Sequence, residues 1–173
     1  MSLDNSAAQL AIADTPQMAA FRRTILNPLK LRLFMIQRLP MAYLAGLRVR
    51  SLTTSAATVT VPFKYLTKNP FRSIYFACLG MAAELAGGIQ AMMHVSSGAP
   101  VSMLVTGMEA QFTKKAVGLI AFTCPDGVHI GQAVAESRAT GEGRTVVATS
   151  TGVDETGDVV AVFRVTWSFR AKK

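Results

Sequence analysis

Residues 74–95 read IYFACLGMAAELAGGIQAMMHV and form the longest apolar segment of the chain. The segment is too long for a strand, and its Ala, Leu and Met residues favour a helix in spite of its glycines. Glu84, Gln90 and His94 interrupt it. We therefore expect no membrane span, which needs about 20 consecutive apolar residues, and we predict the central buried helix of a globular domain.

Glu84 is the single acidic residue among residues 15–108, a region that holds ten Lys and Arg residues. No Lys or Arg occurs from residue 73 to residue 113, so the sequence offers this carboxylate no local ion pair. Two interpretations stay open. Glu84 is either a base or nucleophile with a raised pKa, or a carboxylate that accepts hydrogen bonds from backbone or a partner subunit, or lies in water at an edge. Its predicted helix face carries mostly small residues: Ala77, Gly80, Met81, Gly88 and Ala91.

The N-terminal part of the chain has a helical pattern. Residues 1–16 are small and polar and predict a frayed arm. Between residues 17 and 39 apolar residues recur at intervals of three and four, which predicts one amphipathic helix, bent at Pro28 and ended by Pro40. Residues 41–45 can add another turn. The basic side of this helix is a solvated face, a patch for phosphate-bearing ligands or a contact with a membrane surface.

The rest of the chain has the alternation typical of strands. Two early strands are expected at residues 47–50 and 57–64, and Ser73 is the expected cap of the central helix. Four or so later strands are expected in a meander. An antiparallel sheet with one helix packed on one face accounts for this order, so the predicted fold class is α+β. The later strands are expected at 101–112, 116–124, a weaker stretch 128–137, 145–153 and 159–170.

Composition narrows the class of protein. The 173 residues are 50% hydrophobic and 16% charged, which fits one globular domain and excludes intrinsic disorder. The net charge of +8 raises the possibility of nucleic-acid binding, but no reading motif accompanies it, and we expect no such partner. Cys78 and Cys124 are predicted to be reduced core residues of a cytoplasmic protein. His94 and His129 lack neighbours at ligand spacing, so no metal and no cofactor is expected.

Residues 69–88 read NPFRSIYFACLGMAAELAGG. This pattern resembles the helix-entry motif of hotdog-fold thioesterases of the phenylacetate-pathway and hydroxybenzoyl-CoA type. In that motif an Asn precedes a Gly, a His-Gly-Gly triplet, an apolar run ending in Asp or Glu, and a further Gly. The chain departs from it by carrying Arg72 for the first Gly and Tyr75, Phe76 and Ala77 for the triplet. The matching positions are Asn69, Leu79, Ala83, Glu84, Ala86 and Gly88.

The resemblance extends over roughly residues 46–171 and implies a hotdog domain at 46–173 behind an N-terminal arm and helix at 1–45. It implies a sheet wrapped around the long helix and two subunits that pair their sheets edge to edge. The protein would then be a homodimer or tetramer with active sites at the subunit interface.

The resemblance also implies roles for residues. Backbone N–H groups at Phe76 and Ala77 would polarise a thioester carbonyl, with Tyr75 beside them in the substrate site. Glu84 of the opposite subunit would activate water or attack directly. Asn69 would position the water or the thioester. Thr106, on the strand after the helix, is a further substrate-binding candidate.

Two functions follow as hypotheses. The first is hydrolysis of an acyl-CoA or related acyl thioester, in which the many cations would bind the phosphates of the carrier. The second is a non-catalytic hotdog module that binds an acyl chain or a CoA ester.

Overall fold

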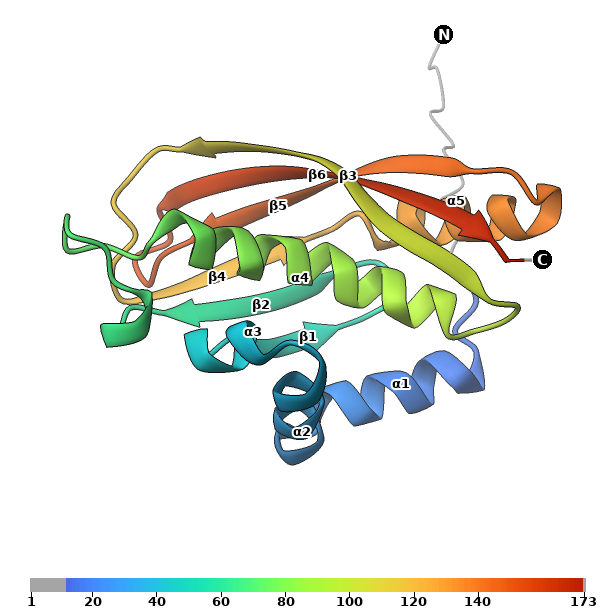
Figure 1. Cartoon of the computed structure of the whole chain (residues 1–173), viewed down its shortest axis with the longest axis horizontal. Helices are drawn as coiled ribbons and strands as arrows, with labels where there is room; N and C mark the ends of the chain where they lie inside the picture. Colours follow the sequence, from blue (N-terminus) through green and yellow to red (C-terminus); the bar gives the residue numbers. More distant parts are fainter. Residues whose placement is uncertain (1–11, 173) are drawn as a thin grey trace, which may run out of the picture.

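The computed structural model describes residues 12–172 and shows a six-stranded antiparallel sheet with one long helix across it (Figure 1). The strands lie side by side in the order β1-β2-β4-β5-β6-β3. The predicted α+β class, with one sheet around one long helix behind a helical N-terminal region, is confirmed. The strands are β1 (Arg48–Leu52), β2 (Ala57–Pro62), β3 (Val101–Phe112), β4 (Leu119–Cys124), β5 (Arg144–Val153) and β6 (Val159–Ala171).

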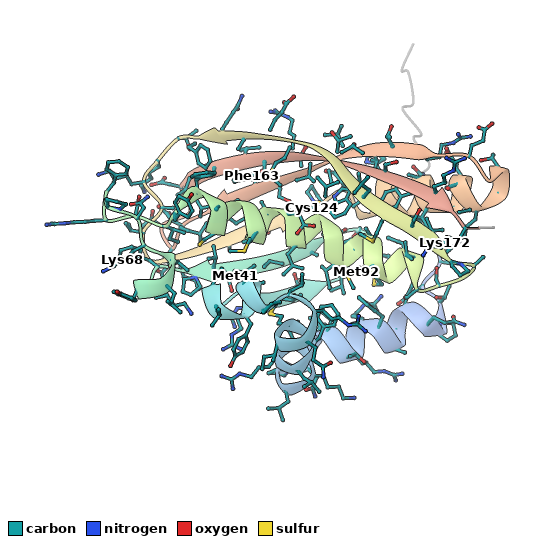
Figure 2. All side chains as sticks on the ribbon, in the orientation of Figure 1. Met41, Lys68, Met92, Cys124, Phe163 and Lys172 are labelled. Carbon is teal, nitrogen blue, oxygen red and sulfur yellow. The ribbon has the colours of Figure 1, made fainter. Side chains whose placement is uncertain are left out.

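The predicted central helix is α4 (Phe76–Val95), which lies along the inner face of the sheet. Its glycines allow a close approach to the strands. A Cβ added to Gly88 would lie 3.3 Å from the Trp167 ring, and one added to Gly87 would lie 3.4 Å from the indole nitrogen of that ring. Figure 2 shows Phe163, which is 2% exposed, between α4 and the sheet. Each glycine lowers the intrinsic stability of the helix, and the burial of apolar surface against the sheet offsets this loss.

The apolar character of α4 is explained by this packing. By length and composition alone the helix could cross a membrane, but 67% of its most apolar window is buried inside the protein. Burial of this extent is typical of the core helix of a globular domain.

Strand β3 does not follow the predicted meander. It pairs with β6 from Val101 opposite Ala171 to Phe112 opposite Ala161, so the chain crosses from one edge of the sheet to the interior between β3 and β4. The long β3 and β6 match each other in length, whereas β4 is short and pairs with β2 and β5. As a result β3 is an edge strand, and within residues 12–172 its outer side has no partner.

The weak strand expected at residues 128–137 is wrong, because this segment is helix α5 (Gly127–Thr140). Ile130, Val134 and Ser137 are buried at intervals of four and three, which is a helical period. The helix ends at Gly141, whose φ of 74° is in the left-handed region. The alternating Ala and Val residues near its middle misled the sequence interpretation.

The N-terminal segment forms α1 (Pro16–Leu26), α2 (Pro28–Arg38) and α3 (Pro40–Ala45) rather than one bent helix. Asn27 separates the first two, and its Oδ1 accepts hydrogen bonds from the N–H groups of Leu29 and Lys30, both at 3.1 Å. Each helix begins with a proline, which lacks the N–H that a first turn leaves unpaired. The frayed arm predicted for residues 1–16 lies mostly outside the described residues.

The cap predicted at Ser73 is also wrong. The cap position of α4 is Tyr75, which makes no side-chain capping bond. Ser73 instead receives a hydrogen bond of 3.0 Å from the Nδ2 group of Asn69.

Arg138 on α5 closes the other end of α4. Its Nη2 group donates to the carbonyl oxygens of Val95 at 2.8 Å and His94 at 3.3 Å, and its Nε group donates to Ala99 O at 2.9 Å. One cation thereby donates to carbonyls of the last turn of the helix, of which His94 O also accepts from Ser97 Oγ at 2.7 Å, and it stands at the negative end of the helix dipole.

We expect the variant Arg138→Ala to lower the free energy of unfolding by about 1–3 kcal/mol, because partly buried carbonyl groups lose a charged donor. Arg144→Ala is the matched control, since Arg144 contacts the exposed carboxylates of Glu136 and Glu142. It should stay within about 0.5 kcal/mol of the parent protein in chemical denaturation. Equal losses in the two variants would contradict the role given to Arg138.

Candidate active site

Glu84 lies in the middle of α4 and opens onto a cavity of about 270 Å³, called here the Glu84 cavity. One wall comes from α4 itself and the other from the junction of α2 and α3, which crosses over the helix at this point. Apart from Arg38, the residues around the carboxylate are apolar. The lining residues are Arg38, Leu39, Pro40, Met41, Ala42, Met81, Glu84 and Leu85.

The carboxylate of Glu84 has no salt bridge and no hydrogen bond with any other residue among 12–172. Arg38 lines the same cavity but is not within ion-pair distance of it. Burial raises the pKa of the Glu84 carboxyl above its ordinary value of 4.5. A carboxylate with a raised pKa holds a proton more strongly, so it is a better general base.

Because Gly88 has no side chain, space beside it is available to the Glu84 carboxylate. A Cβ added to Gly88 would lie 3.1 Å from Glu84 Oε1. The glycine one turn along α4 therefore serves both the close approach to Trp167 and the position of the Glu84 side chain.

The first backbone N–H groups of α4 have no hydrogen-bond acceptor among the described residues. The first α4 amides with a backbone acceptor are Cys78 N, which donates to Tyr75 O at 2.9 Å, and Leu79 N. The N–H groups of Phe76 and Ala77 make no hydrogen bond within residues 12–172. Free N–H groups at the positive end of a helix dipole suit a carbonyl oxygen that gains negative charge.

A second cavity, called here the helix-entry cavity, lies beside these N–H groups and has a volume of about 620 Å³. Tyr75 and Phe76 stand at it as an edge-to-face aromatic pair with ring centroids 4.8 Å apart. They are 46% and 57% exposed, so they flank the free amides without filling the cavity. The lining residues are Asn69, Pro70, Phe71, Ser73, Ile74, Tyr75, Phe76, Leu79, Phe112, Thr113, Lys114, Lys115 and Ala116.

Asn69 shapes the loop that leads into α4. Its Oδ1 accepts from the N–H groups of Phe71 at 3.0 Å and Ser73 at 3.1 Å, and its Nδ2 donates to Ser73 Oγ. Arg72, inside this loop, has a φ of 59°, the only positive φ of a non-glycine residue among those described. Backbone of this kind favours glycine, the residue that the resembled motif carries there. The Asn69 side chain therefore holds a strained turn, while a contact with water or substrate stays a prediction.

Thr106 lies apart from both cavities. It is exposed on the edge strand β3, at an irregularity of the pairing with β6, and its Oγ1 donates to Thr166 O at 3.3 Å. Within one chain the structure does not bring Thr106 to Glu84 or to the start of α4. Its side chain belongs to the open edge of the sheet.

The free N–H groups and Glu84 are too far apart in one chain to serve the same carbonyl group. Glu84 follows Phe76 by eight positions, and a rise of about 1.5 Å per residue places them roughly 12 Å apart along α4. Within one chain the two groups therefore lie at separate places, the free N–H groups at the start of the helix and the carboxylate at its middle.

Sequence reasoning missed the contribution of the N-terminal segment to the site. Leu39 and Met41 line the cavity onto which Glu84 opens. From the sequence, their segment was interpreted as an extension separate from the central helix α4. Pro40 begins α3 at the point where the chain crosses α4. No local sequence pattern predicts which part of α4 this turn will contact.

Comparison with solved structures gives the same fold. The structure of PA5026 from Pseudomonas aeruginosa, a protein of unknown function for which thioesterase activity is suggested, matches with a TM-score of 0.69 and 22% identity, over 86% of this chain and 99% of that chain. Thioesterase HI1161 from Haemophilus influenzae matches with a TM-score of 0.57 and 12% identity, over 80% of this chain and 88% of that chain. The predicted resemblance to hotdog-fold thioesterases is thus confirmed for the fold.

Comparison of sequences leads to one family. No curated protein matches the chain. A family described as a domain of unknown function, DUF4442, matches residues 30–169, so the match begins inside α2 and runs to the last strand. Because this match spans most of the sequence and includes α4 with Glu84 and nearly all of the sheet, the chain belongs to the DUF4442 family.

Proposed function

We propose that the protein is a thioesterase that hydrolyses an acyl thioester of the acyl-CoA type. The observation that carries the proposal is the Glu84 carboxylate, which is half-buried in an apolar cavity without a cationic partner among the described residues. Keeping such a group costs stability, and general base catalysis is the use that needs this environment. The thioesterase descriptions of several structures with the same fold agree with it.

The proposed site needs a second copy of the chain. The N–H groups of Phe76 and Ala77 in one subunit would face Glu84 of the other, since one chain holds these groups roughly 12 Å apart. The open side of β3, twelve residues long, is the edge through which two sheets would pair. The proposed active form is a homodimer, or a tetramer built from such dimers.

The proposed reaction is attack by water. Glu84 takes a proton from water as the oxygen attacks the thioester carbon, and the negative charge that develops on the carbonyl oxygen is stabilised by the N–H groups of Phe76 and Ala77. The C–S bond then breaks, and the proton passes from Glu84 to the departing sulfur. The products are a carboxylic acid and a thiol.

The surroundings of the two cavities support an acyl thioester of CoA type as substrate. Leu39, Met41 and Met81 give the Glu84 cavity an apolar lining suited to an acyl group. Lys68 and Arg72 line a groove beside the helix-entry cavity and are placed for phosphates. Lys114 also lines the helix-entry cavity, but its Nζ group forms ion pairs with Asp154 at 2.6 Å and Asp158 at 2.7 Å, so we do not assign it to the phosphates.

The proposed location is the cytoplasm. Cys78 and Cys124 are both free and buried, as in proteins of reducing compartments.

The alternative function, a non-catalytic module for acyl chains or CoA esters, is supported by the aromatic pair at the start of α4. Tyr75 replaces the histidine of the resembled motif and offers a phenolic O–H in place of an imidazole nitrogen. The module would bind acyl-CoA without releasing free thiol.

The variant Glu84→Gln should lower the rate of acyl-CoA hydrolysis by at least about 100-fold, because the amide cannot accept the proton of water. Release of free CoA thiol is measured across acyl chains of increasing length. Glu142→Gln is the matched control, because Glu142 lies exposed in the turn after α5 and should leave the rate unchanged. Equal activity in the two variants would refute the proposed role, and binding without thiol release in the parent protein would favour the module.

Glu84 should also make activity and stability depend on pH in opposite directions. Activity should fall as the pH drops through the raised pKa of Glu84, because the base becomes protonated. Stability should fall as the pH rises from 4.5 to that raised pKa, because the unfolded chain releases this proton more readily than the folded one.

Chemical denaturation of Glu84→Gln checks the second effect without any need for activity. The variant should lack the loss of stability over that pH range, and the difference from the parent protein should grow with pH. A parallel pH dependence in both proteins would show that Glu84 has an ordinary pKa.

A further inference from the structure

Helix α2 is apolar on two opposite sides. Leu31 and Met35 are 4% and 2% exposed and pack into the protein. Leu29, Leu33 and Ile36 are 76%, 57% and 48% exposed. At about 100° per residue these three lie within roughly 60° of one another and opposite the buried pair. They form a continuous apolar stripe on the outer side of the helix, called here the outer stripe.

Cations border the outer stripe. Lys30 lies on one side of it and Arg32 on the other, and both are exposed. No acidic residue occurs between residues 15 and 83 of the sequence. The nearest described one before this segment, Asp14, is already paired with Arg22 at 2.8 Å. Glu84 is half-buried in its cavity under the junction of α2 and α3. Helix α2 itself therefore carries charges of one sign only.

Neighbouring helices extend the same kind of surface. Leu26 at the end of α1 is 39% exposed, and Leu44 of α3 is 48% exposed. Single exposed apolar residues are ordinary, but five large ones on three short consecutive helices call for a partner.

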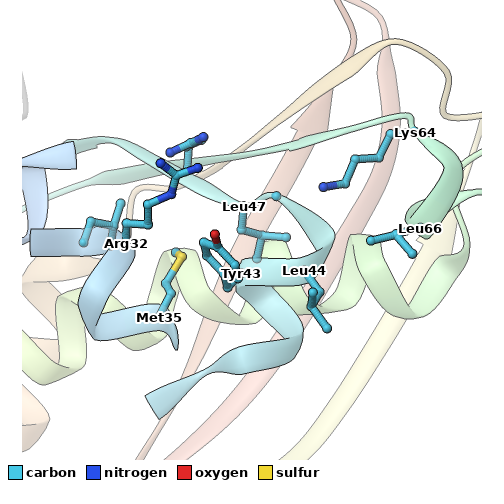
Figure 3. Close-up of a pocket in the computed structure, with 10 residues that line it drawn as sticks. Arg32, Met35, Tyr43, Leu44, Leu47, Lys64 and Leu66 are labelled. Atoms are coloured by element: carbon cyan, nitrogen blue, oxygen red, sulfur yellow. The ribbon is translucent and has the colours of Figure 1, made fainter. Parts of the chain in front are cut away.

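A pocket with three cations lies on the side of α2 that carries Leu31 and Met35, and it shares Arg32 with the border of the outer stripe. Figure 3 shows this pocket. Arg32 of α2, Arg48 of β1 and Lys64 after β2 converge on a space of about 260 Å³, and none of them has a carboxylate within 4.0 Å among residues 12–172. Arg32 lies 5.8 Å from the ring centre of Tyr43. Cations from three separate elements line one space without a carboxylate among the described residues, so an anion in that space would be stabilised by all three. The remaining lining residues are Leu31, Met35, Leu44, Gly46, Leu47 and Leu66.

We propose that this face, formed by the outer stripe and its border of Lys30 and Arg32, binds the surface of a bilayer that contains anionic phospholipid. Exposed leucines flanked by Lys and Arg are the pattern of a helix that lies in the membrane interface. The apolar side chains enter the acyl boundary, and the two cations, of which Arg32 also lines the pocket, lie at the level of the lipid phosphates. Strand β3 lies at the opposite edge of the sheet from β1, beside which Figure 1 shows α1 and α2, so the edge proposed to pair with a second copy is not the edge that these helices cover.

Sedimentation with vesicles tests the proposal with the full-length protein. Binding to vesicles of phosphatidylcholine and phosphatidylglycerol should be at least about tenfold stronger than binding to phosphatidylcholine alone, and added salt should weaken it. The double variant Leu29→Ser/Leu33→Ser should lose at least about tenfold in binding. Arg32→Ala should lose about fivefold.

Val147→Ser is the matched control, because Val147 is 51% exposed on β5, away from this face. It should bind vesicles as the parent protein does, and circular dichroism should show the same helix content in every variant.

Three results would overturn the proposal. The first is no binding of the parent protein to anionic vesicles, or equal binding by the double variant. The second is a smaller mass of the double variant in analytical ultracentrifugation with unchanged vesicle binding, which would make the stripe a contact between copies. The third is binding of soluble glycerol phosphate that depends on Arg32, without vesicle binding, which would make the pocket a site for free anions.

Discussion

The close contact between α4 and the sheet is the constraint on which the rest of the structure depends. Gly87 and Gly88 let the helix backbone approach Trp167, and the strands curve around the helix that they cover. Larger residues at these two positions would press on the indole ring and push the helix away. The buried apolar side chains among residues 12–172 form one core cluster, and this contact is part of it.

This contact also explains the chemistry of the candidate site. A helix held by one face cannot turn to expose Glu84 fully, so the carboxylate stays half-buried under the crossing of α2 and α3. The same rigidity keeps the free N–H groups of Phe76 and Ala77 at a set distance from it. The two halves of the proposed mechanism meet only through a partner subunit, which makes assembly part of the proposed catalysis.

The sequence predicted the elements that have a clear period and missed those that lack one. The central helix and the strands β1, β2, β3, β5 and β6 agree with the expectations to within a few residues. Helix α5 was missed because its apolar residues are also compatible with a short strand. Its close packing against α4 depends on Gly127 and Gly131, and the periodicity of a short sequence segment does not predict such packing. The place of β3 beside β6 is a long-range pairing, and strand periodicity says nothing about which strands are neighbours.

The sequence by itself determined the kind of domain, the central helix and the isolation of its one carboxylate, because these follow from local period and from the absence of Lys and Arg around residue 84. Only the tertiary structure decided what surrounds that carboxylate. The crossing of α2 and α3 over Glu84, the turn held by Asn69 and the open edge at β3 bring together residues far apart in the chain. The physical reason is that burial and pairing depend on neighbours in space, which the order of residues along the chain does not specify.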